Sequence, residues 1–152
     1  TQESLIEQFE QLIKIRDRVS DVHDAAEKIR RIRAQIEGWE QRVQGGSGTE
    51  DLLETAASLK VKLSSIETEL VAMEPPPGSL RGEVSRLNGQ LASLAGVVAS
   101  ADWVPTKQSY AVFEELSERV DAQLGALQQT IDTDVTSFNK LIEKAGIPAV
   151  ST

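Results

Sequence analysis

The sequence predicts an all-α protein: an antiparallel four-helix bundle whose long first and fourth helices extend as a stalk beyond two shorter ones. Apolar residues recur at steps of three and four along nearly the whole chain. Short segments rich in glycine or proline (GGSG, PPPGS and ADWVPT) separate the stretches that carry this period. No stretch alternates apolar and polar residues convincingly, as a half-buried strand would. The 152 residues suffice for a single domain with a sizeable core, which we place over 1–152.

The first helix is expected over residues 4–44. Ser4 and Glu7 form the pattern of a capping box, and GGSG ends the helix. Its apolar stripe changes face between Val19 and Val22, because two steps of three follow each other there.

The second helix is expected over residues 50–74, with Thr49 as its cap and PPPGS as its end. Its apolar residues follow a heptad without a break: Leu52, Ala56, Leu59, Leu63, Ile66, Leu70 and Met73.

The third helix is expected over residues 80–101, capped by Ser79, with a similar heptad of leucine and valine. It carries no charged residue from Leu87 to Ala101. On the side away from the leucines lies a stripe of small residues that includes Gly82, Gly89 and Gly96. This stripe is either a close-packing face for another backbone or simply a surface of small residues.

The fourth helix is expected over residues 107–145. Thr106 is its cap, Pro105 precedes it, and the Gly-Ile-Pro sequence at 146–148 ends it and begins a tail over 146–152.

The helix lengths predict the stalk. At 1.5 Å per residue, the first and fourth helices are each about 60 Å long and the other two about 35 Å. Short connections favour antiparallel neighbours, so the first half of the first helix should pair with the second half of the fourth. That seam is wide for two helices, and we expect a second copy in a homodimer, or an adjoining domain of the parent chain, to cover it. The contact residues predicted for this surface are Leu5, Ile6, Phe9, Ile13, Ile15, Phe138, Leu141 and Ile142.

The composition argues against several classes of function. The net charge of −8 disfavours nucleic acids and anionic membrane surfaces, and no apolar run is long enough for membrane insertion. The single histidine, His23, lies between Asp21 and Asp24 and has no cysteine or second histidine to complete a zinc site. Asp132 and Asp134 are two residues apart on a helix and point in different directions. We therefore predict no metal, no cofactor and no catalytic residue.

Two further groups of side chains leave alternatives open. Arg16, Arg30 and Arg33 fall near core-facing positions, where they pair with aspartates of the fourth helix or cover the seam with their stems while their heads reach water; the second interpretation is preferred. Trp39 and Trp103 are expected near the top of the bundle, where they cap the core or bind a sugar or peptide; core capping is the preferred interpretation.

Three stretches, IKIRDRVSDVHDAAEKIRRIRAQI, DWVPTKQSYAVFEELSERVDAQL and FNKLIEKAGIP, are similar to one known family. They resemble the helical C-terminal region of large bacterial proteins with sortilin-like BNR (Asp-box) β-propellers, often labelled glycosyl hydrolases. The resemblance covers nearly the whole chain and implies an accessory module of an exported protein. It brings no hydrolase chemistry, because the Asp-box pattern Ser-x-Asp-x-Gly-x-Thr-Trp is absent here.

We therefore expect a non-catalytic structural or interaction module that mediates self-association or interdomain packing. The alternative is a small-ligand-binding or sensor bundle with a pocket beside the small-residue helix. The compartment is unassigned, and is periplasmic or extracellular if the resemblance holds.

Overall fold

The protein is an all-α bundle, as predicted. The computed structural model describes residues 1–46, 48–71, 86–100 and 104–146. It is 91% helical over these residues, and none of them lies in a strand. The helices are α1 (Gln2–Val43), α2 (Glu50–Leu70), α3 (Leu87–Ser100), α4 (Lys107–Thr130) and α5 (Thr136–Ala145), with a π-helical turn, η1 (Ile131–Val135), joining the last two. Two long helical segments and two shorter ones are therefore present. α4, η1 and α5 form one of the long ones, which we call the α4–α5 segment.

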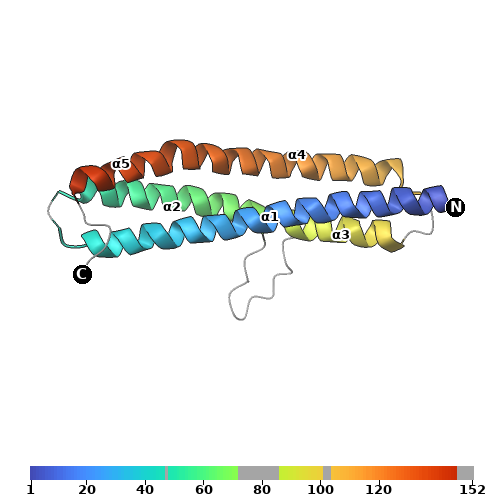
Figure 1. Ribbon diagram of the computed structural model, residues 1–152, viewed down its shortest axis with the longest axis horizontal. Helices are drawn as coiled ribbons and strands as arrows, with labels where there is room; N and C mark the ends of the chain where they lie inside the picture. Colours follow the sequence, from blue (N-terminus) through green and yellow to red (C-terminus); the bar gives the residue numbers. More distant parts are fainter. Residues whose placement is uncertain (47, 72–85, 101–103, 147–152) are drawn as a thin grey trace.

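The helices form an elongated rod (Figure 1). α1 runs its full length, α2 lies along the second half of α1, and α3 lies along the first half. Side-chain contacts fix this arrangement. Lys60 of α2 donates to Glu40 of α1 with a 2.6 Å Nζ–Oε2 distance, and Gln8 of α1 donates to the carbonyl oxygen of Val98 of α3 at 2.7 Å. The α4–α5 segment runs along the other side of both short helices.

The placement of α3 corrects the expected stalk. The third helix was predicted to turn back beside the second, but it continues in the same direction toward the beginning of α1. As a result, the first half of α1 lies beside α4, where Arg18 and Asp121 form a 2.8 Å ion pair. A stalk of two helices would leave wide apolar flanks in water, and α3 lowers this cost by covering one of them.

The buried seams match the heptads read from the sequence. In α2 every seam residue from Leu52 to Leu70 is buried, and in α3 the buried residues are Leu87, Leu91, Leu94 and Val98. α1 and the α4–α5 segment complete the core with Ile15, Val22, Ala25, Ala26, Ile29, Ile36, Val43, Leu116, Val120, Leu127, Phe138 and Ile142. The core therefore runs as one apolar column along the described rod.

The starts of the helices agree with the predicted caps in part. Thr106 Oγ1 accepts a hydrogen bond from the Ser109 amide at 3.1 Å, as expected of an N-cap. α1 is capped by Thr1 and not by Ser4, because the Thr1 hydroxyl accepts from the Ser4 amide at 3.3 Å and the helix begins at Gln2. Thr49 stands at the N-cap of α2, but its hydroxyl donates to the Gly46 carbonyl at 2.9 Å instead of accepting from the helix.

Two of the helices, α1 and α5, end next to a glycine. Gly45 has a φ of 84° after α1, and Gly146 has a φ of 65° after α5, both in the left-handed region that favours glycine. α2 ends at Leu70, before the expected end at 74, because Val71 is extended. Residues 72–74 and 80–85 of the expected helices, the Ser79 cap and most of the tail lie outside the described residues.

Candidate interaction surface

The predicted contact residues of α1 are mostly at the surface. Leu5, Ile6 and Phe9 are 65%, 50% and 63% exposed, although they are large and apolar. Ile13 is half-buried, and Ile15 is buried in the core. The amino-terminal turns of α1 therefore present the unsatisfied apolar surface that the sequence predicts there.

The predicted contact residues of the fourth helix lie elsewhere. Phe138 and Ile142 are buried and Leu141 is half-buried, all on α5, which packs against α2. α5 and the start of α1 are at opposite ends of the rod (Figure 1). The predicted pairing of these two sets is wrong, because α1 and α4 run parallel, which places the first half of α1 beside α4 and far from α5.

Exposed apolar side chains gather at one end of the rod. Of the seven large hydrophobic residues that are exposed in the described part of the chain, only Val61 lies on α2. The other six lie where α1 and α4 begin and α3 ends (Figure 1). We call this group the amino-end ring: Leu5, Ile6, Phe9, Val97, Val104 and Tyr110. Single exposed apolar residues are ordinary, but a group of this kind is typical of a contact surface.

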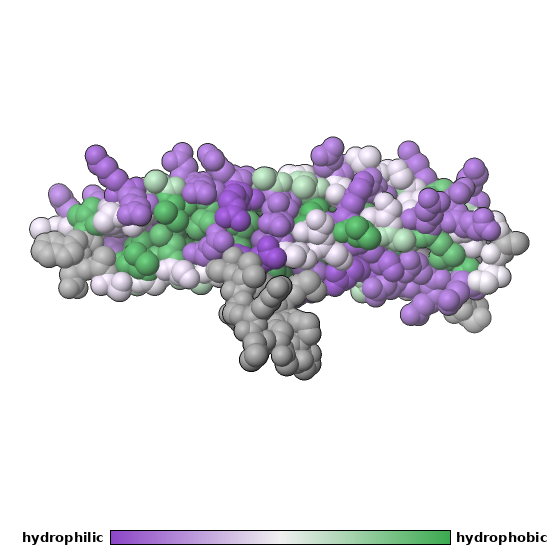
Figure 2. Space-filling model, turned by 180° about the vertical axis from the view of Figure 1, so that it is seen from behind, coloured by the Kyte–Doolittle hydropathy of each residue, from purple (hydrophilic) through white to green (hydrophobic). Residues whose placement is uncertain are grey.

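A groove between α3 and α4 lies at the same end. Its volume is about 590 Å³, and Leu94, Val112 and Leu116 are among its apolar lining residues. Arg119 of α4 donates to Gln90 of α3 at 3.0 Å (Nη1–Oε1) and so bridges the two helices that form the groove. Figure 2 shows hydrophobic surface between these helices at this end of the molecule.

The small-residue side of α3 is open at Gly96. A Cβ added to Gly96 has no neighbour within 4 Å, and Gly89 is half-buried. Gly82 lies outside the described residues. The exposed residues of α3 are all uncharged: Ala92, Ser93, Gly96, Val97, Ala99 and Ser100. Within the described chain this side is a surface of small residues.

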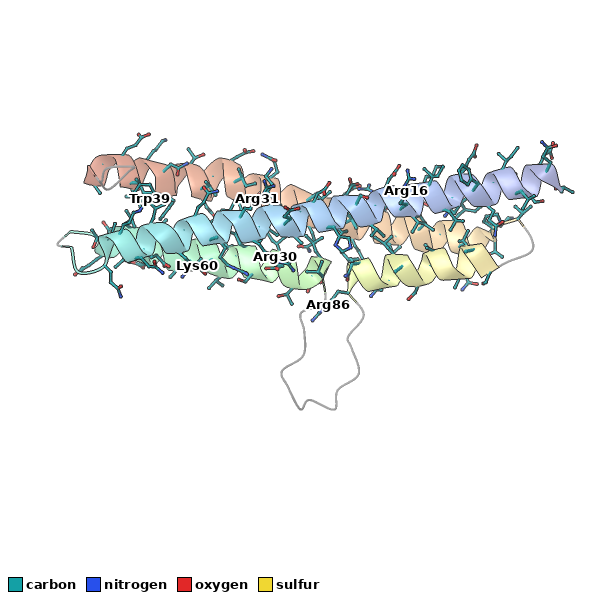
Figure 3. The ribbon with its side chains drawn as sticks, turned by 60° about the horizontal axis from the view of Figure 1, so that its bottom comes forward. Arg16, Arg30, Arg31, Trp39, Lys60 and Arg86 are labelled. Atoms are coloured by element: carbon teal, nitrogen blue, oxygen red, sulfur yellow. The ribbon has the colours of Figure 1, made fainter. Side chains whose placement is uncertain are left out.

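Two of the three core-facing arginines bind a buried carboxylate that the sequence did not single out. Glu67 of α2 is 3% exposed; its Oε1 accepts from Arg30 Nε at 2.8 Å and its Oε2 from Arg33 Nη1 at 2.9 Å. Arg33 also donates to the Ser64 hydroxyl at 3.1 Å. Figure 3 shows Arg30 between α1 and α2. The alternative in which Arg30 and Arg33 pair with aspartates of the fourth helix is therefore wrong, since α2 and not α4 faces this side of α1.

The remaining charged candidates have local partners. Arg16 is exposed and pairs with Asp17 at 3.2 Å. Asp134 accepts from Lys62 of α2 at 2.6 Å, and Asp132 accepts from Gln128 at 2.8 Å. These contacts join α2 to η1 and hold the first turn of η1, which is a structural role.

The π-helical turn has a signal in the sequence that periodicity alone misses. Hydroxyl side chains on both sides of η1 donate to carbonyl oxygens of the helix: Thr130 to Ala126 at 2.8 Å, and Ser137 to Thr133 at 2.9 Å. Such back-bonding competes with the regular α-helical ladder. The run TIDTDVTS at 130–137 is dense in the residue types that do this.

His23 is exposed on α1. Over residues 1–46, 48–71, 86–100 and 104–146, no three His, Cys, Asp or Glu side chains come together in a way that could hold a metal ion. None of the helices in these ranges is long and apolar enough to cross a bilayer.

Trp39 is half-buried near the end of α1, with the Arg42 guanidinium 4.8 Å from the centre of its ring. This is the geometry of a cation–π contact. Trp103, the second member of the expected pair, lies outside the described residues.

In comparisons with known proteins, no family model, no curated protein and no solved structure matches the chain.

Proposed function

We propose that this chain is a non-catalytic interaction module whose amino-end ring docks onto another protein surface. The observation that carries the proposal is the gathering of six of the seven exposed large hydrophobic residues at one end of the described rod. The rest of the rod has a continuous core of its own, so these side chains are not needed to fold it.

The size of the apolar group supports a docking role. Full burial of a leucine, isoleucine or phenylalanine side chain contributes about 1.5–3 kcal/mol. Leu5, Ile6 and Phe9 each keep half or more of their surface in water in this chain. Association costs at least several kcal/mol of lost freedom, which burial of these side chains together with the rest of the ring offsets. The covering surface is an adjoining domain of the parent chain or a second copy in a homodimer.

We also propose, on the sequence resemblance alone, that the module belongs to a larger exported protein with a BNR (Asp-box) propeller. Repeats of Ser-x-Asp-x-Gly-x-Thr-Trp in the same open reading frame are the expected finding, and their absence from the complete gene would contradict this part of the proposal.

Cysteine labelling tests the docking role, because the chain contains no cysteine of its own. Ile6→Cys places a thiol in the amino-end ring, and Val61→Cys places one on α2, with both parent residues at least half exposed. In the dilute isolated chain we expect maleimide to label both at rates within about threefold, since both thiols face water. In the complete natural protein we expect labelling at position 6 to be at least tenfold slower than at 61. Equal rates in the complete protein, and in the isolated chain at high concentration, would contradict docking at this end.

A small apolar ligand in the α3–α4 groove is a second candidate function. Its volume of about 590 Å³ falls in the range of drug-sized pockets, and its lining combines four apolar residues with seven polar or charged ones. The fluorescent probe anilinonaphthalene sulfonate should bind the isolated chain, and Val112→Asn should weaken binding at least fivefold. Val61→Asn, on α2 and outside the groove, is the matched control and should change nothing. Binding that both variants leave unaltered would exclude the groove as the site.

A further inference from the structure

The first fifteen residues of α1 carry an apolar stripe with an acidic border on one side. Gln2, Ile6, Phe9 and Ile13 follow steps of four and three, so they form one line on the helix. Ile6 and Phe9 are exposed and Ile13 is half-buried. Arg16 continues the line and, as an exposed charged residue, ends its apolar part.

The acidic border is a row of carboxylates seven residues apart. Glu3, Glu10 and Asp17 each follow a stripe position by one residue and are all exposed. Asp17 pairs with Arg16, whereas neither Glu3 nor Glu10 forms an ion pair with any described residue. Glu7 and Lys14 lie further round on the same side, so this border has a net negative charge with Lys14 included.

The other border of the stripe is uncharged. Leu5 and Leu12 lie there, followed by α3, which Gln8 joins to α1 through the carbonyl oxygens of Val98 and Ala99 at 2.7 and 3.3 Å. α3 has no charged residue between Leu87 and Ser100. A partner that covers the stripe therefore meets negative charge along one side of it only.

We infer that this stripe docks an amphipathic helix whose own apolar stripe is bordered by lysine or arginine. The inference rests on the proposed function and names the chemistry of the partner. A helix in this position meets Ile6, Phe9 and Ile13 with its apolar residues and Glu3 and Glu10 with its basic ones. Contact from Gln2 to Arg16 spans about 22 Å, which is the length of two heptads.

Charge argues against a second copy of this chain on the same stripe. An antiparallel copy places the row of Glu3, Glu10 and Asp17 against itself, and a parallel copy places it against the row of Leu5 and Leu12. Neither arrangement supplies a basic partner, and the first brings like charges together, which disfavours the pair. Exposed ion pairs contribute little affinity singly, so the carboxylates select the partner while the apolar stripe holds it.

Two designed peptides of 21 residues test the inference by fluorescence anisotropy against the isolated chain. Both carry leucine along one heptad stripe; one has lysine at the bordering positions and the other has glutamate. We expect the lysine peptide to bind at least tenfold more tightly at low salt, with the ratio shrinking as salt screens the charges. Phe9→Ser should weaken its binding at least tenfold.

Matched variants separate the acidic border from the overall charge of −8. Glu3→Gln with Glu10→Gln should weaken binding of the lysine peptide about three- to tenfold. Glu114→Gln with Glu118→Gln changes the charge equally on exposed positions of α4 and should alter binding less than twofold. Equal effects of the two pairs, or equal binding of the two peptides, would overturn the inference.

The remaining outcomes distinguish this inference from the proposed function. If neither peptide binds while position 6 is protected in the complete protein, the docking role stands and the basic helix is wrong. If light scattering shows a dimer that Phe9→Ser dissociates, the occupant is a second copy, which also overturns the inference.

Discussion

Replacing Leu91 with alanine is expected to lower the free energy of unfolding by about 3 kcal/mol, because it leaves a cavity at a fully buried position. Leu91 is 0% exposed in the middle of α3, a helix of 14 residues that is too short to be stable by itself. Its stability therefore depends on packing against α1 and α4. Urea denaturation followed by circular dichroism measures the change.

Val97→Ala is the control on the same helix. Val97 is 60% exposed, so its truncation should change the free energy of unfolding by less than about 0.5 kcal/mol. If the two variants behave alike, α3 does not pack against the first half of α1. That half would then be the two-helix stalk read from helix lengths.

The heptads of α2 and α3 were readable from the sequence because each is a single uninterrupted seam. Every residue predicted on them from Leu52 to Leu70, and from Leu87 to Val98, is buried. Periodicity defines a face of one helix, but it carries no information about which neighbour covers that face. The sequence therefore predicted the elements and not the order in which the two short helices lie along α1.

The same limit explains the candidate contact surface. Leu5, Ile6 and Phe9, which the sequence predicts as contact residues, are exposed on the first turns of α1. Phe138 and Ile142 have a similar pattern in the sequence, yet α2 covers them. The Glu67 site was missed for a related reason. It is one position from the seam residue Ile66, and only the approach of Arg30 and Arg33 from α1 makes it a buried ion pair.

Removing that carboxylate is expected to have an effect as large as that of a core cavity. Glu67→Ala should cost about 2–3 kcal/mol of unfolding free energy. This estimate lies below the usual loss for a buried pair, because the Arg30 and Arg33 side chains, 60% and 26% exposed, regain water. A loss below about 0.5 kcal/mol in urea denaturation would show that the carboxylate is hydrated and does not join the two helices.

A paired variant determines what the buried charges contribute. Arg33→Met with Glu67→Leu replaces the more buried half of the network with apolar side chains that can pack between α1 and α2. We expect its free energy of unfolding to lie within about 1 kcal/mol of the wild-type value. Glu67→Leu alone is expected to be less stable than this double variant, because it leaves Arg33 without its carboxylate partner. That result would mean that the ion pair adds little net stability. Its effect is then to select the register of α2 on α1, because any other register leaves Glu67 buried without a cation. A double variant as unstable as Glu67→Ala would instead show that the ion pair itself stabilises this half of the rod.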